Sequence, residues 1–82
     1  MIVVAWTRTR PTVAASGVRV VHHLEDAQAF AQDRVGPLPV VDEKEDIARA
    51  TDGDTVVTVK VSGIDDNGRE VGIRDVFPKE GL

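Results

Sequence analysis

Valine is the residue that most constrains the fold of this chain. Fifteen valines stand against three aromatic residues in 82 positions, and many of them occur where apolar and polar residues alternate. β-Branched side chains favour strands because they pack well on a pleated surface, and a period of two places them on one face. The sequence therefore predicts a sheet with a valine core, each valine contributing about 1.5 to 3 kcal/mol when fully buried.

Two strands are predicted in the N-terminal quarter. Residues 2–9 alternate, with Ile2, Val4 and Trp6 on one face. Pro11 ends this strand, because proline cannot donate to a ladder and pushes the residue before it out of regular pairing. We expect a loop of small residues over 12–17 and a second strand over 18–23.

One clear helix and one weaker helix are predicted next. The first covers 25–34, with an apolar stripe of Ala27, Phe30 and Ala31, and ends at Gly36-Pro37. Residues 38–41 lie beyond that proline and include another, so they are extended, either as a short edge strand or as a packed connector. Asp42 and Glu45 have capping-box spacing, which predicts a second, short helix through residue 50 or 51.

A hairpin is predicted at the C-terminal end. Residues 55–62 and 70–77 are β-branched runs on either side of Asp66-Asn67-Gly68, and Asn and Gly tolerate the positive φ of tight turns. Val57, Val59 and Val61 would face the core from the first arm and Val71, Ile73 and Phe77 from the second. Thr58, Lys60, Ser62 and Arg74 would then lie on the opposite, wetter face.

These elements in the order ββα(β)αββ predict an α+β fold. We expect a two-layer sandwich in which a mainly antiparallel four-stranded sheet carries one or two short helices on one face. Residues 1–78 form a single domain and 79–82 a C-terminal tail, because a chain of this length has room for one core. A core made of valine is thin, so a homodimer would add buried apolar surface.

Composition excludes several kinds of chemistry. The chain has no cysteine, so disulfides, thiolate zinc sites and cysteine nucleophiles are absent. The apolar N-terminal run is only six residues long, too short for a signal peptide or a membrane span, and we expect a cytoplasmic protein without a membrane partner. Seven arginines against three lysines and a single asparagine are typical of a GC-rich genome, and we interpret the origin as bacterial or phage.

Charge is distributed unevenly along the chain. Residues 1–24 carry three arginines and no acid, residues 25–54 carry nine acids and three bases, and residues 55–82 carry five acids and four bases. The segments therefore have charges of +3, −6 and −1, and the chain has a net charge of −4. This asymmetry predicts a basic and an acidic region, unless the fold pairs them.

The histidines and acidic clusters do not form a convincing catalytic or metal site. His22 and His23 are adjacent in a predicted strand, so their rings point to opposite faces and cannot easily share one metal ion. We interpret the acids of 42–46 as a helix start, and 65–68 as a turn without the ligand pattern of a calcium loop. No nucleotide-binding or nucleophile motif is present, so we predict neither catalytic residues nor a cofactor. A small oligomeric enzyme or metal site that uses His22 or His23 stays as an alternative.

Two binding hypotheses remain. The first is a non-catalytic protein-binding module, such as an adaptor, inhibitor or accessory protein, which would use the open sheet face, the acidic segment or an edge strand, including self-pairing. The second is nucleic-acid binding on an aromatic and basic platform. The net charge of −4 argues against it, and we expect instead that Trp6 is buried and that the arginines pair with helix acids. The speculative binding residues are Trp6, Arg8, Arg10, Lys60 and Arg74.

Overall fold

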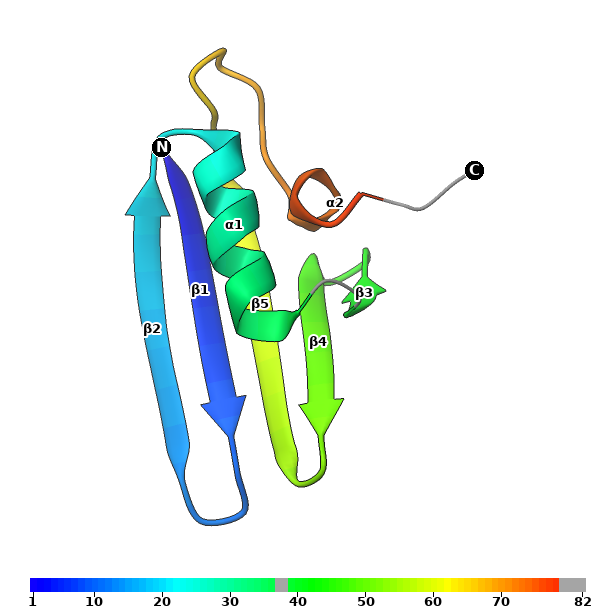
Figure 1. Ribbon diagram of the computed structural model, residues 1–82. Coiled ribbons are helices and arrows are strands. Elements are labelled where there is room, and N and C mark those ends of the chain that lie inside the picture. The colour runs from blue at the N-terminus through cyan, green and yellow to red at the C-terminus, as the bar shows by residue number, and fades with distance from the viewer. Residues whose placement is uncertain (37–38, 79–82) are drawn as a thin grey trace.

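A five-stranded antiparallel sheet organises the molecule. The computed structural model describes residues 1–36 and 39–78, and its strands lie in the order β2-β1-β5-β4-β3 (Figure 1). The predicted α+β class and antiparallel pairing are confirmed, whereas the predicted four-strand count is wrong. The strands are β1 (Ile2–Thr9), β2 (Ala14–Val21), β3 (Val40–Asp42), β4 (Ile47–Asp52) and β5 (Thr55–Gly63).

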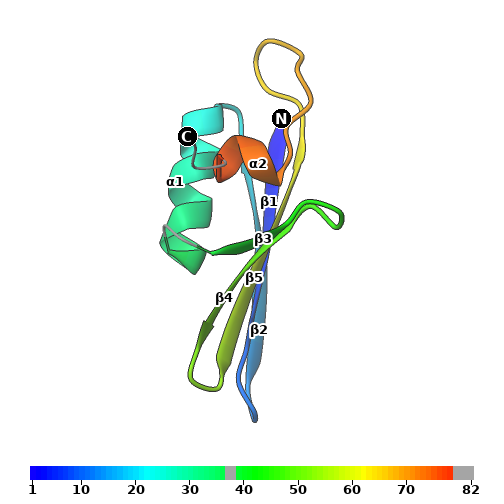
Figure 2. The same ribbon diagram turned by 90° about the vertical axis from the view of Figure 1, so that its right-hand side faces the viewer.

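Both helices lie on the same side of this sheet (Figure 2). Helix α1 (Leu24–Val35) confirms the prediction for 25–34, and α2 (Ile73–Val76) is a single turn. The buried face of α1 consists of Ala27, Ala31 and Val35, whose spacing of four residues places them on one stripe. Two alanines on that stripe let the helix approach the valine side chains of the sheet closely.

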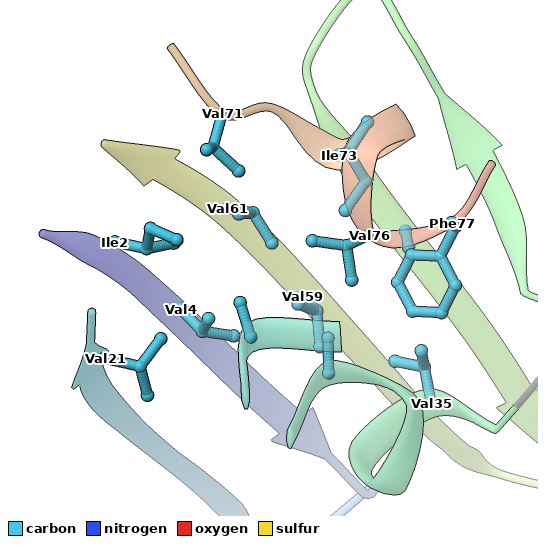
Figure 3. Close-up of a cluster of buried hydrophobic side chains, with 13 residues drawn as sticks. Ile2, Val4, Val21, Val35, Val59, Val61, Val71, Ile73, Val76 and Phe77 are labelled. Atoms are coloured by element: carbon cyan, nitrogen blue, oxygen red, sulfur yellow. The ribbon is translucent and has the colours of Figure 1, made fainter. Parts of the chain in front are cut away.

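The core lies between α1, α2 and the two central strands (Figure 3). Ile2 and Val4 of β1 and Val59 and Val61 of β5 are fully buried, as predicted for these strand faces. Val57 packs partly against the same cluster. Strands β2 and β4, the two helices and the residues flanking α2 supply the rest of the core: Val21, Ala27, Ala31, Val35, Ala48, Val71, Ile73, Val76 and Phe77.

The predicted C-terminal hairpin is wrong in its second arm. Strand β5 pairs with β1 on one side and β4 on the other, so it has no free edge for residues 70–77. The turn itself is present, because Asp65 Oδ1 accepts hydrogen bonds from the backbone N–H of Asn67 and Arg69. Only one bridge, between Ile64 and Glu70, continues the pairing. The chain then turns into α2, which still buries the apolar residues of that arm.

The predicted second helix is also wrong, because residues 42–51 form most of a β3–β4 hairpin. Asp42 Oδ1 accepts hydrogen bonds from the backbone N–H groups of Lys44 and Glu45, at 3.0 and 3.2 Å. The same bonds that would start a helix close a tight turn here. Asp46 then adopts a positive φ of 62°, which a continuing helix excludes.

Strand β2 starts and ends earlier than predicted, so His22 and His23 lie beyond it, at the start of α1. Residues 14–17, expected to be part of a loop, pair in register with Trp6 to Thr9. Of the extended segment predicted over 38–41, Val40 and Val41 belong to β3, and Leu38 lies outside the described residues. The tail predicted over 79–82 also lies outside them.

Candidate functional site

The face of the sheet away from the helices carries an apolar patch beside β2. Val3 lies opposite Val20, and Ala5 lies opposite Val18, so these four side chains are neighbours on that face. Val18 is 67% exposed and Val20 is 51% exposed. We call Val3, Ala5, Val18 and Val20 the β2 patch. Exposed valines at the edge of a sheet are costly to leave in water, and they favour contact with another apolar surface.

The hydrogen-bond pattern shows which peptide groups of β2 face outward. Met1 and Ile64 exchange backbone bonds, which makes the odd-numbered β1 residues the partners of β5. The even-numbered residues of β1 therefore bond to β2, and Arg10 and Val13 continue this pattern in the turn. The remaining β2 residues direct N–H and C=O away from the sheet, and these are Ala14, Ser16, Val18 and Val20.

Strand β2 lacks the features that usually protect an edge. Natural edge strands are shortened, bulged, or carry lysine and proline, because a bare row of peptide groups recruits other strands. The eight residue pairs between β1 and β2 run without a bulge. Arg19 is the one charged residue in β2. The four residues whose peptide groups face outward are alanine, serine and two valines. No strand of residues 1–36 and 39–78 pairs with the outer side of β2, so within this part of the chain the edge is open to pairing.

The opposite edge, strand β3, is short and lies between a proline and a tight turn. Strand β3 has three residues, begins directly after Pro39 and ends at Asp42, whose carboxylate closes the following turn. Asp46 in that turn accepts a hydrogen bond from Ile73 N–H at 2.9 Å and so fixes the start of α2. Asp42 and Asp46 thus have identifiable structural contacts, and Glu43 adds one, with its Oε1 3.4 Å from Arg74 Nε.

The five speculative binding residues do not form one surface. Trp6 and Arg8 lie on the helix side of β1, as alternation from the buried Val4 requires, and Arg10 follows in the turn. Lys60 lies on the opposite face of the sheet, where it is exposed beside Ala5. Arg74 belongs to α2. The structure therefore brings Trp6 and Arg8 together, with Arg10 following them in the turn, and separates them from Lys60 and Arg74.

Sequence reasoning missed a cluster of aromatic and arginine side chains on the helix side of the sheet. The Arg34 guanidinium lies 4.4 Å from the Trp6 ring centroid and 4.9 Å from that of Phe30, and Arg19 lies 5.3 Å from Phe30. Trp6 is half-buried against the core. The spacing of four residues between Phe30 and Arg34 was the available signal for part of this cluster.

The expected pairing of the N-terminal arginines with helix acids is not found. Within residues 1–36 and 39–78, Arg8, Arg10 and Arg19 form no ion pair. Arg19 instead lines a shallow groove together with Asp26 and Asp33 of α1. The basic charge near β1 and β2 is therefore left without a carboxylate in contact in the described part of the chain.

The histidines lie on the surface at the end of β2. His23 Nδ1 contacts Asp66 Oδ2 at 2.5 Å, and both side chains are more than half exposed. His22 is exposed as well. Among the described residues, no three side chains of histidine, aspartate or glutamate come close enough to hold a metal ion. We therefore interpret the pair between His23 and Asp66 as a surface contact.

Comparison with models of protein families, with curated proteins and with solved structures gave no match. Neither helix in the described residues has the length and apolar character needed to cross a bilayer.

Proposed function

We propose that this protein is a protein-binding module that captures an extended segment by adding it as a strand to β2. In this mode of recognition, backbone hydrogen bonds supply affinity and alternate side chains supply specificity. The observation that carries the proposal is the uninterrupted β2 edge, with four residues whose peptide groups face outward beside the β2 patch. We expect the module to act as an adaptor, inhibitor or accessory protein without catalytic turnover.

The β2 patch gives the captured strand a place for its side chains. An added strand lies about 4.8 Å from β2, and its alternate side chains fall beside Val18 and Val20. Each apolar side chain placed there removes valine surface from water. A partner segment with alternating valine, isoleucine or threonine therefore fits this edge better than a charged segment.

A selected peptide tests this proposal. Ten-residue peptides selected from a random display library against the purified protein are titrated into ¹⁵N-labelled protein and followed by amide chemical shifts. We expect the largest shifts at Ala14, Ser16, Val18 and Val20, and slower hydrogen exchange of their amides. Selected peptides that bind but shift only residues of α1 or β3 would overturn the proposal.

Two proline variants provide the matched comparison. The Val18 N–H faces outward, so Val18→Pro removes an outward donor and leaves the bonds to β1 intact. Thr51 of β4 lies opposite Val56, in a pair that does not bond to β5, and beyond the residues paired with β3. Thr51→Pro is therefore the control at the other edge. Val18→Pro should abolish peptide binding, whereas Thr51→Pro should leave it unchanged.

Nucleic-acid binding remains a second candidate because Trp6 and Arg8 share the helix side and Arg8 and Arg10 have no carboxylate partner among the described residues. This candidate predicts salt-dependent binding of single-stranded oligonucleotides. The variant with Arg8→Ala and Arg10→Ala should weaken that binding in fluorescence anisotropy at low salt. Flat titrations of the wild-type protein with oligo-dT and oligo-U would eliminate it.

A further inference from the structure

We infer that the segment captured by β2 is β2 of a second copy of this chain, paired antiparallel about a two-fold axis at Gly17. This inference rests on the proposed function, because it names the partner for the same edge. Pairing of this kind would join two five-stranded sheets into one continuous sheet. Closed two-fold symmetry uses the same surface on both copies, so only one patch per chain is required.

The outward-facing residues of β2 fit this axis in one register. With Gly17 opposite Gly17, Ser16 pairs with the partner's Val18, and Ala14 pairs with the partner's Val20. All four outward-facing residues of each copy then exchange hydrogen bonds. A shift of two residues in either direction leaves one of them outside the paired strand. A shift of four leaves two of them outside, and in one direction it also places the two Arg19 side chains opposite each other.

The same register brings the two β2 patches together. Val18 and Val20 of each copy lie beside Ser16 and Ala14 of the other, on the face that the helices leave open. No charged side chain of β2 is on that face, because Arg19 lies on the helix side. Exposed valine surface of one copy is thus covered by small side chains of the other.

Charge complementarity on the helix side supports a second copy in particular. Helix α1 covers the part of the sheet where β1 begins and β2 ends, and the β1–β2 hairpin extends past it (Figure 1). Antiparallel pairing places the partner's Arg19 opposite Ala15, which itself lies opposite Arg8. The partner's groove beside Arg19, lined by Asp26 and Asp33, therefore comes level with Arg8 and Arg10.

This placement accounts for the uneven charge of the sequence. In one copy, Arg8 and Arg10 lie at the end of the sheet that α1 does not reach, and they form no ion pair among the described residues. In the pair, carboxylates of the partner's α1 provide a counter-charge for Arg8 and Arg10. The copy's own α1 does not extend to these two arginines. The attraction requires the antiparallel arrangement, since parallel pairing would place helix beside helix.

Sedimentation equilibrium tests the inference on the full chain. We expect wild-type protein to approach twice its monomer mass of 8.8 kDa as concentration rises. Val18→Pro should weaken association at least about 30-fold, because it removes one donor from each copy at a symmetric interface. Thr51→Pro should associate like the wild type. Val18→Lys keeps every backbone group and should also dissociate the pair, which separates loss of pairing from loss of folding.

The register is tested with engineered cysteines, since the chain has none of its own. An equimolar mixture of Ser16→Cys and Val18→Cys proteins should form mixed disulfides on oxidation, because the paired Cα atoms lie about 5.5 Å apart. Val18→Cys alone should cross-link at least about tenfold more slowly, as its cysteines would be diagonal rather than opposite. Faster cross-linking of Val18→Cys alone would overturn the register.

The outcomes distinguish this inference from the proposed function. If the wild-type protein is monomeric at all concentrations while selected peptides still protect the outward amides of β2, self-pairing is overturned and strand capture stands. If a dimer forms and Val18→Pro leaves it intact, the pairing is at another surface and the inference is wrong. If neither peptides nor a second copy engage β2, both proposals fail.

Discussion

The two edges of the sheet differ in how well they are protected against pairing with another strand. The β3 edge has three paired residues, Val40–Asp42, directly after Pro39, and Asp46 ties the adjoining turn to α2. The β2 edge has eight paired residues without proline, bulge or acid. This contrast between the edges is the basis of our proposal that a partner strand is added at β2 and not at β3.

The sharpest test of this contrast compares adjacent residues within β2. The Arg19 N–H bonds to β1 opposite Val4, whereas the Val18 N–H faces outward. Arg19→Pro should lower the free energy of unfolding by about 3 kcal/mol, because it breaks a ladder bond and leaves a carbonyl unpaired. Val18→Pro should cost about 1 kcal/mol or less.

Urea unfolding of both proline variants measures this difference, with Arg19→Ala as the control for loss of the arginine side chain. The variants are compared at concentrations at which the wild-type protein is monomeric, so that association does not contribute. Equal destabilisation by Arg19→Pro and Val18→Pro would show that the assignment of outward-facing residues is wrong.

A second test concerns the helix side of the β2 edge. A Cβ atom added at Gly17 would lie 2.7 Å from Trp6 Nε1 and 2.9 Å from two further indole atoms. Gly17→Ala should therefore displace the indole from its place beside Arg34 and destabilise the protein by about 2 kcal/mol. The chain has a single tryptophan, so its fluorescence reports the displacement directly.

Ser16→Ala is the matched control for Gly17→Ala, because Ser16 is exposed on the opposite face of the same strand. It should change neither the tryptophan spectrum nor the stability by more than about 0.5 kcal/mol. An unchanged spectrum in Gly17→Ala would contradict the close approach of Trp6 to this strand.

A third test weakens the protected edge. Asp46→Ala removes the acceptor for Ile73 N–H and places alanine at a φ of 62°, so we expect a loss of about 1.5 kcal/mol. Asp46→Asn keeps an oxygen acceptor and tolerates that φ, and it should cost much less. Thermal unfolding compares the two variants. Equal losses would mean that neither the hydrogen bond from Ile73 N–H nor the tolerance of that φ accounts for the loss.

The smallest expected effect is at the β3–β4 turn. Asp42→Ala removes the carboxylate that accepts from Lys44 and Glu45 N–H. These bonds are exposed to water, so we expect a loss of about 0.5 kcal/mol in urea unfolding, and Asp42→Asn should retain most of the stability. A loss of stability as large as that of Asp46→Ala would contradict the prediction that the Asp42 carboxylate contributes less than the Asp46 carboxylate.

Elements whose pattern alone decides their structure were predicted from the sequence. Strand β1 and helix α1 each have one consistent period and clear end signals. Ile2, Val4, Ala27 and Ala31 are buried as expected, whereas Trp6 and Phe30 are only partly buried. Residues 42–51 and 70–77 were mispredicted for a different reason. Asp42 makes the same backbone bonds in a turn as at a helix start, and 70–77 has no strand to pair with once β5 is enclosed by β1 and β4.

The candidate site was predictable only in outline. Alternation placed Val59 and Val61 inward and left the other face wet, which indicates an open sheet face. Which peptide groups of β2 face outward depends on its register with β1, and that register extends into residues 14–17, where small side chains gave no strand signal. The stacking of Arg34 on Trp6 likewise depends on where α1 crosses the sheet.

Amide hydrogen exchange along β2, measured as a function of protein concentration, tests the central claim most directly. At low concentration we predict alternation, with Ala15, Gly17 and Arg19 protected and Ser16 and Val18 exchanging fast. Protection at Ser16 and Val18 should then rise with concentration, while Val41 and Thr51 at the other edge stay unchanged. Exchange at Ser16 and Val18 that is slow at every dilution, or insensitive to concentration and to selected peptides, would contradict the claim that β2 is the binding edge.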